Sequence, residues 1–152
     1  MTTPLLSSAV PGAYRATVTL SELAEKAALE AGVEPRTVEL IRIRASQLNG
    51  CGFCLRLHVR DALAKDESVD RLAVLPAWRE TDYFSPAERA ALAIAEEITH
   101  IGTPSGGGRT PGGGDDDTGA VSDQQAAAMR WVAIAINAFN RVAISSRYTV
   151  KP

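Results

Sequence analysis

The sequence predicts an all-α fold of about six helices, in a single domain over residues 1–152. Aromatic residues make up only 5% of the chain while alanine is plentiful, which favours helices that pack closely through small side chains. Apolar residues recur at helical spacing in successive segments, and no segment alternates as a β-strand would. A chain of this length can bury a core without metals or disulfides.

The N-terminal third predicts an arm followed by two helices. Residues 1–14 show no periodicity and contain prolines, a glycine and scattered serines, so we expect an extended arm there. Apolar positions at helical spacing from Ser21 onward predict the first helix, with Gly32 as its stop signal. The second helix is expected to begin at Pro35, which suits a first helical position, and to end at Gly50.

Four further helices are predicted after Gly50. One runs from about residue 51 to 65, and a short one near residues 69–75 is closed by Pro76. The next two each begin with a capping box, in which a serine is followed three positions later by Glu or Gln. These boxes are Ser85 with Glu88, before a helix that ends near Gly102, and Ser122 with Gln125, before a long last helix.

Residues 102–119 are rich in glycine and contain two prolines and an acidic triplet, a composition that predicts a flexible loop. The glycine run ending at Arg109 is not a phosphate-binding loop. It lacks the required spacing, the following Lys-Ser/Thr pair and the strand-to-helix context.

Charge and hydropathy exclude several classes of partner. The formal net charge is −2, from 16 basic and 18 acidic residues, and no basic run is present, so nucleic acid is not an expected partner. No apolar stretch reaches the length of about 18 residues that a membrane span needs, and the first 15 residues lack the pattern of a secretory signal. We therefore expect a cytoplasmic protein with no membrane association.

The chain has two cysteines, in the run Cys51-Gly52-Phe53-Cys54. A bridge this short cannot stabilise a fold by closing a loop, so in a reducing compartment the pair indicates redox chemistry or metal binding. Because a helix ends at Gly50, Cys51 is expected at the N-cap or first turn of the next helix, where free N–H groups favour a thiolate. Cys54 and His58 follow at helical spacing and share that face.

Three interpretations of the cysteine pair remain open: a redox pair, half of a zinc site, and inert buried cysteines. Zinc is disfavoured because a structural site needs four ligands and the chain offers neither a second CxxC nor a nearby pair of histidines. No metal or other cofactor is therefore expected. The position of His58, four residues after Cys54 on the same helical face, favours the redox interpretation. His100 is expected only to contact the C-terminal carbonyls of its helix.

Periodicity alone gives Glu39 no special role. It shares a narrow polar stripe with Arg42 and Ser46, and its simplest interpretation is a surface ion pair with Arg42 or Arg36.

The segment from Glu39 to His58 closely resembles the core motif of the carboxymuconolactone decarboxylase and alkyl hydroperoxidase D superfamily. That motif is Glu, eleven residues, Cys, two residues, Cys, three residues, His, and all four defining residues are present here at those spacings. The resemblance extends from about Leu20 to Arg147, and the glycine-rich insert at 102–119 departs from it.

This resemblance implies an AhpD-like, all-helical domain that assembles as a homotrimer or homohexamer. It implies that Cys54 is the peroxidatic cysteine, which becomes a sulfenic acid, and that Cys51 resolves it to a disulfide. Glu39 and His58 would act as a proton relay. The implied partners are a small hydroperoxide substrate and a thiol or disulfide protein that exchanges electrons with the pair.

Three functions are consistent with these residues. The first is a thiol-dependent peroxidase or disulfide oxidoreductase that cycles between dithiol and disulfide. The second is an enzyme of the carboxymuconolactone decarboxylase type, which uses acid–base chemistry and does not need two thiols. The third is a noncatalytic helical oligomer that senses oxidants through its disulfide.

Overall fold

The computed structural model describes residues 2–103 and 118–152, and within them every regular element is a helix. The elements are, in chain order, α1 (Leu6–Ala9), α2 (Pro11–Glu30), α3 (Pro35–Asn49), α4 (Gly52–Leu63), α5 (Val69–Val74), the 3₁₀-helix η1 (Leu75–Glu80), α6 (Pro86–Thr99), the 3₁₀-helix η2 (Thr118–Ala120) and α7 (Asp123–Ser145). The predicted all-α class is confirmed. No helix in these two ranges is long and apolar enough to cross a membrane.

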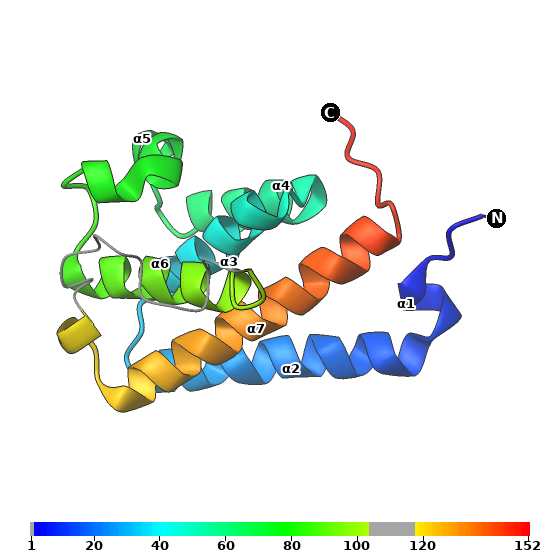
Figure 1. Cartoon of the computed structure of the whole chain (residues 1–152), viewed down its shortest axis with the longest axis horizontal. Helices are drawn as coiled ribbons and strands as arrows, with labels where there is room; N and C mark the ends of the chain where they lie inside the picture. Colours follow the sequence, from blue (N-terminus) through cyan, green and yellow to red (C-terminus); the bar gives the residue numbers. More distant parts are fainter. Residues whose placement is uncertain (1, 104–117) are drawn as a thin grey trace.

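The two longest helices, α2 and α7, lie side by side and run in opposite directions (Figure 1). Helix α3 packs against α4, α6 and α7, which places it at the centre of the domain. Both chain termini lie at the same end of the molecule, where α1 and the residues after α7 emerge (Figure 1). The cavity that forms the candidate site lies between α2, α4, α7 and the residues after α7.

Among the described residues, the core is divided among three clusters of buried side chains, and α3 contributes to all of them. The first joins α2, α3, α6 and α7 and is rich in alanine, which lets these helices approach closely. The second surrounds Trp78, and the third contains Cys51 and Cys54. Because other helices pack against α3 on several sides, nine of its 15 residues are buried, among them Glu39 and Arg42.

The N-terminal prediction was wrong. Residues 6–9 form α1, and α2 begins at Pro11 rather than Ser21, so of the predicted arm only residues 2–5 are described without regular secondary structure, apart from a bend at Val10. Tertiary contacts replace the missing periodicity: the Tyr14 ring packs edge-on against Phe139 of α7, with centroids 6.1 Å apart.

Most of the other helix boundaries were correctly predicted from local sequence signals such as capping residues. Both capping boxes are present, Cys51 is the N-cap of α4, and His100 is the C-cap of α6. Pro76 does not stop the helical path, because it occupies an early position of η1, which continues directly from α5. Most of the predicted flexible loop at 102–119 lies outside the described residues, and its last part contributes to η2.

Candidate active site

The cysteine pair begins at a tight junction between α3 and α4. Gly50 adopts the left-handed conformation (φ 66°), which ends α3 at little cost because glycine has no side chain. The Cys51 backbone N–H donates to the Ser46 carbonyl at 3.0 Å, while the Cys51 sulfur accepts the Cys54 N–H at 3.4 Å. One residue therefore closes α3 and caps α4.

The two sulfur atoms lie 2.7 Å apart as free thiols. Cys51 is 1% exposed and Cys54 3% exposed, so bulk solvent scarcely reaches either side chain. Burial, together with the hydrogen bond between the two thiols, raises the pKa of Cys54 to about 12, although a hydrogen bond with Asn140 opposes the shift. At Cys54 the site therefore favours the protonated thiol. The prediction that the helix start favours a thiolate was made for Cys51, the N-cap of α4, and stays a prediction.

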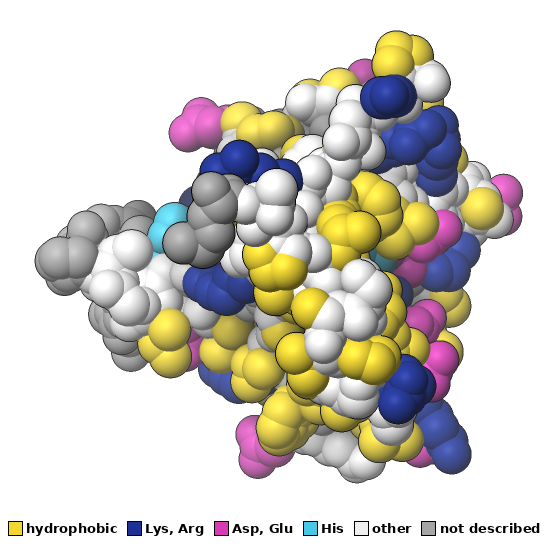
Figure 2. All heavy atoms as spheres, turned by 90° about the vertical axis from the view of Figure 1, so that its right-hand side faces the viewer, with side chains coloured by type: hydrophobic (Ala, Val, Ile, Leu, Met, Phe, Trp, Pro, Cys, Tyr) yellow, Lys and Arg dark blue, Asp and Glu magenta, His cyan; other side chains and the backbone are white. Residues whose placement is uncertain are grey.

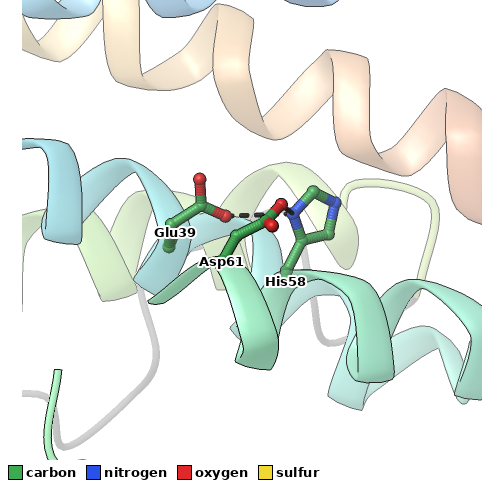
Figure 3. Close-up of side chains that lie close together, drawn as sticks. All are labelled: Glu39, His58 and Asp61. Carbon is green, nitrogen blue, oxygen red and sulfur yellow. Dashed lines mark hydrogen bonds and ion pairs between the residues drawn. The ribbon is translucent and has the colours of Figure 1, made fainter. Parts of the chain in front are cut away.

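Glu39 is buried at the centre of a charged cluster. Its Oε1 accepts hydrogen bonds from Arg42 at 3.0 Å and from Lys65 at 2.5 Å, and its Oε2 lies 3.0 Å from His58 Nδ1 (Figure 3). Burial alone would raise the pKa of Glu39, but the His58 hydrogen bond, the Arg42 charge and the Lys65 hydrogen bond lower it to about 2. The predicted pair with Arg42 exists, but it is buried.

The ionised Glu39 determines which nitrogen of His58 carries hydrogen. A carboxylate only accepts hydrogen bonds, so the Nδ1 that faces it must be the protonated nitrogen. In a neutral ring this leaves Nε2 as an acceptor. His58 is one helical turn after Cys54 on α4, and both side chains line the same cavity.

That cavity has a volume of about 270 Å³ and lies between α2, α4, α7 and the C-terminal residues. Its walls are mainly apolar and include the aromatic rings of Tyr14, Phe53, Phe139 and Tyr148. Hydrophobic side chains also gather on the end of the molecule that carries both termini (Figure 2). Of the two cysteines, only Cys54 lines the cavity.

A chain of amides fixes α7 against α3 beside the thiols. The Asn49 side-chain NH₂ donates to Asn137 Oδ1 at 2.9 Å and to Asn140 Oδ1 at 2.8 Å, and Asn140 in turn donates to Ser46 Oγ at 3.0 Å. Motif reasoning assigned these residues no role. The available signal was the pair of asparagines three positions apart on an otherwise apolar face of α7.

Three potential metal-ligating side chains, Glu39, His58 and Asp61, have ligand atoms that lie within 4.8 Å of one another (Figure 3). The charge of Glu39 is already balanced by Arg42 and Lys65, and the positive charges of these two side chains would repel a metal cation. Asp61 is half-exposed and lies 3.9 Å from His58. The cluster is suited to holding the imidazole ring in place.

Residues 11–97, more than half of the chain, match the model of the Carboxymuconolactone decarboxylase family. The chain therefore belongs to this family, as the motif from Glu39 to His58 predicted.

Two similar proteins add to this assignment. The chain is 46% identical over 77 residues to the uncharacterized protein YdfG of Bacillus subtilis, and this match covers 51% of the chain and about half, 52%, of that relative. It also resembles a crystal structure of a protein of unknown function, ATU0492 from Agrobacterium tumefaciens, for which a role as the antioxidant defence protein AhpD has been suggested. That match has a TM-score of 0.81 and 27% identity, and it covers 100% of this chain and 99% of the other.

Proposed function

We propose that the protein is a thiol-dependent peroxidase that reduces organic hydroperoxides through a dithiol–disulfide cycle of Cys54 and Cys51. The observation that carries the proposal is the geometry of the pair: two free thiols 2.7 Å apart, one of which lines an apolar cavity that also contains His58. The suggested antioxidant role of the Agrobacterium protein supports the same chemistry.

Cys54 is the better placed attacking residue because it lines the cavity. Its pKa of about 12 means that the thiol is protonated near neutral pH, so attack needs a base. The Nε2 of His58 takes the thiol proton as Sγ of Cys54 attacks the terminal oxygen of the hydroperoxide. The O–O bond breaks, the leaving alkoxide takes that proton, and an alcohol and a Cys54 sulfenic acid result.

Cys51 completes the cycle. Its sulfur attacks the sulfur of the Cys54 sulfenic acid, water leaves, and a disulfide forms, so the two thiols supply the two electrons that reduce the peroxide. An external thiol reductant then restores the dithiol. The position of Cys51 at the N-cap of α4 suits this step, because a backbone N–H already donates to its sulfur.

In this scheme Glu39 orients and stabilises His58 and does not itself carry the proton. A carboxyl with a pKa of about 2 remains ionised throughout the neutral range. Its charge fixes the Nδ1–H tautomer and stabilises the imidazolium that forms when His58 takes the thiol proton. Lys65 and Arg42 hold the carboxylate in position from its other oxygen.

The proposal is tested by oxidising the pre-reduced protein with tert-butyl hydroperoxide in a single turnover, without added reductant. The wild type should consume one peroxide for each pair of thiols lost. Cys54→Ser should abolish this consumption, and Cys51→Ser should leave a sulfenic acid on Cys54 that dimedone traps and mass spectrometry locates. Equal consumption by wild type and Cys54→Ser would refute the proposal.

A redox sensor without turnover is a second candidate, favoured by the burial of both cysteines and the high pKa of Cys54. Such a protein would form the disulfide but would not recycle it. Repeated turnover with dithiothreitol as the reductant distinguishes the two: sustained peroxide consumption supports the peroxidase, and a single burst supports the sensor.

A further inference from the structure

The two ends of the chain meet beside the candidate active site. The Leu6 backbone N–H donates to Ser146 Oγ at 3.1 Å, and the Tyr148 hydroxyl donates to Ser7 Oγ at 3.0 Å. These two hydrogen bonds join α1 to the residues that follow α7. The N-terminal helix therefore holds the C-terminal segment in a defined place.

The backbone after α7 turns sharply enough to bring the segment back toward the cysteines. Arg147 adopts the left-handed conformation (φ 52°), which non-glycine residues rarely adopt, and the Tyr148 N–H donates to the Ala143 carbonyl at 3.0 Å. Beyond this turn, Val150 Cγ2 lies 3.7 Å from the position that a Cβ on Gly52 would occupy. The returning segment thus reaches Gly52, which lies between Cys51 and Phe53 in the chain.

Within this segment, the Tyr148 ring forms part of the cavity wall. It packs against Phe53 at a centroid distance of 5.0 Å and an interplanar angle of 70°, and both rings line the cavity that contains Cys54. The ring is fixed at its edge by Phe53 and at its hydroxyl by Ser7. Cys54 itself is only 3% exposed. An oxidant that enters the cavity to reach it must therefore fit beside the Tyr148 ring, which is held at two points.

We propose that Tyr148 is a specificity-determining residue that restricts the oxidant at Cys54 to hydroperoxides with a compact organic group. This inference rests on the proposed peroxidase function, and the reaction is the balanced one given above: two thiols and a hydroperoxide yield a disulfide, an alcohol and water. A cavity of about 270 Å³ accommodates a branched group such as tert-butyl. A long acyl chain exceeds this volume, and we expect the Tyr148 ring, which is held at two points, to hinder its entry.

The experiment measures second-order rate constants for oxidation of the pre-reduced protein by tert-butyl hydroperoxide and by linoleic acid hydroperoxide. The ratio of the second constant to the first is compared between wild type and Tyr148→Ala. Removing the ring should raise this ratio about tenfold or more, the range over which a hydrophobic pocket discriminates by size. Ser7→Ala and Tyr148→Phe, which remove only the hydroxyl tether, should raise it by a smaller factor.

Tyr83→Ala is the matched control. Tyr83 is an exposed tyrosine that donates to Asp70 and does not line the cavity, so its removal should leave the ratio at the wild-type value. If Tyr148→Ala does not fold, Tyr148→Leu replaces it, because leucine keeps an apolar side chain over Phe53 while shortening the wall.

The outcomes separate the two proposals. If the wild type reacts with neither hydroperoxide, the peroxidase function and this inference both fail. If the wild type reacts with tert-butyl hydroperoxide but the folded Tyr148 variant changes the ratio less than twofold, only the specificity role of Tyr148 is overturned. A large change in the ratio that also appears in Tyr83→Ala overturns it as well.

Discussion

A single carboxylate, that of Glu39, organises the charged groups around the candidate active site. It accepts hydrogen bonds from the side chains of Arg42 on α3, His58 on α4 and Lys65 just beyond α4. Its pKa of about 2 shows that these donors outweigh the cost of burial. The carboxylate thus contributes to stability as well as to the position of the imidazole.

Neutralising Glu39 should remove an acid-sensitive part of the stability. Because its pKa is about 2 in the folded protein against an ordinary value of 4.5, the contribution is complete above about pH 4.5 and is lost as the pH falls toward 2. Its size is about 3 kcal/mol. We expect Glu39→Gln to be less stable near neutral pH and to show a flatter pH dependence in this window, measured by denaturant unfolding.

The control for this measurement is Glu80→Gln, which alters an exposed glutamate in η1. It should leave the pH dependence close to that of the wild type. A wild-type stability that does not change between pH 4.5 and 2 would contradict the inferred role of the Glu39 cluster.

The stability that Cys54 contributes should depend on pH in the opposite direction to that of Glu39, and the thiol should become more reactive at high pH. Its pKa is about 12 in the folded protein against an ordinary value of 9.0, so the protonated thiol is favoured by folding and that stabilisation is lost as the pH rises from about 9 toward 12. Alkylation of Cys54 by iodoacetamide, followed by mass spectrometry, should still accelerate above pH 9. A plateau in the rate below pH 9 would show that the site favours the thiolate after all.

Sequence reasoning reached part of this cluster. The spacing from Glu39 to His58 identified four residues that the structure brings to one region. Lys65 and the asparagine network were not predicted, because they approach the site only through the packing of α4 and α7 on α3. A motif records distances along the chain, whereas these contacts depend on the angles between helices.

The junction between α3 and α4 is the element that places the thiols. Gly50 has a positive φ, and nothing lies within 4 Å of the position that a Cβ would occupy, so a substitution there causes backbone strain without a clash. Gly50→Ala should therefore destabilise the protein by about 1–2 kcal/mol, the ordinary cost of a left-handed alanine. The measurement is the free energy of unfolding.

Gly12→Ala provides the matched control. Gly12 lies in α2, also with open space around its Cβ position but with no positive φ. The same substitution should be neutral or slightly stabilising there, because alanine favours the helix. Equal destabilisation by both substitutions would remove the special role of Gly50.

Helix boundaries were predictable where local chemistry determines them. The capping boxes at Ser85 and Ser122 and the N-cap at Cys51 each satisfy backbone groups through nearby side chains. The early start of α2 was not predictable from periodicity, because Tyr14 and its neighbours are held by α7 and the C-terminal segment.

At the scale of the whole molecule, α7 presents large apolar side chains to solvent. Trp131 is 52% exposed and Ile134, one turn later, is 39% exposed. We propose that this face contributes to the interface of a homotrimer or homohexamer, as the family resemblance implies. A large exposed aromatic residue is a typical anchor of such an interface.

Sedimentation equilibrium tests this assembly. The wild type should be larger than a monomer, and Trp131→Glu should weaken association by about 2 kcal/mol or more, the effect expected of an interface anchor. Val69→Glu, at an exposed position on α5, should leave association unchanged. A wild type that remains monomeric would refute the proposal.

In the proposed cycle Cys51 both forms the disulfide and caps α4, so the oxidation state of the pair would affect the first turn of that helix. Its sulfur accepts the Cys54 amide hydrogen and so protects the first turn of α4 from solvent exchange. Once that sulfur is joined to Cys54, it becomes a poorer acceptor held in a new direction. Amide hydrogen exchange at the start of α4 should then be faster in the oxidised protein, so the backbone itself would report whether the pair has reacted.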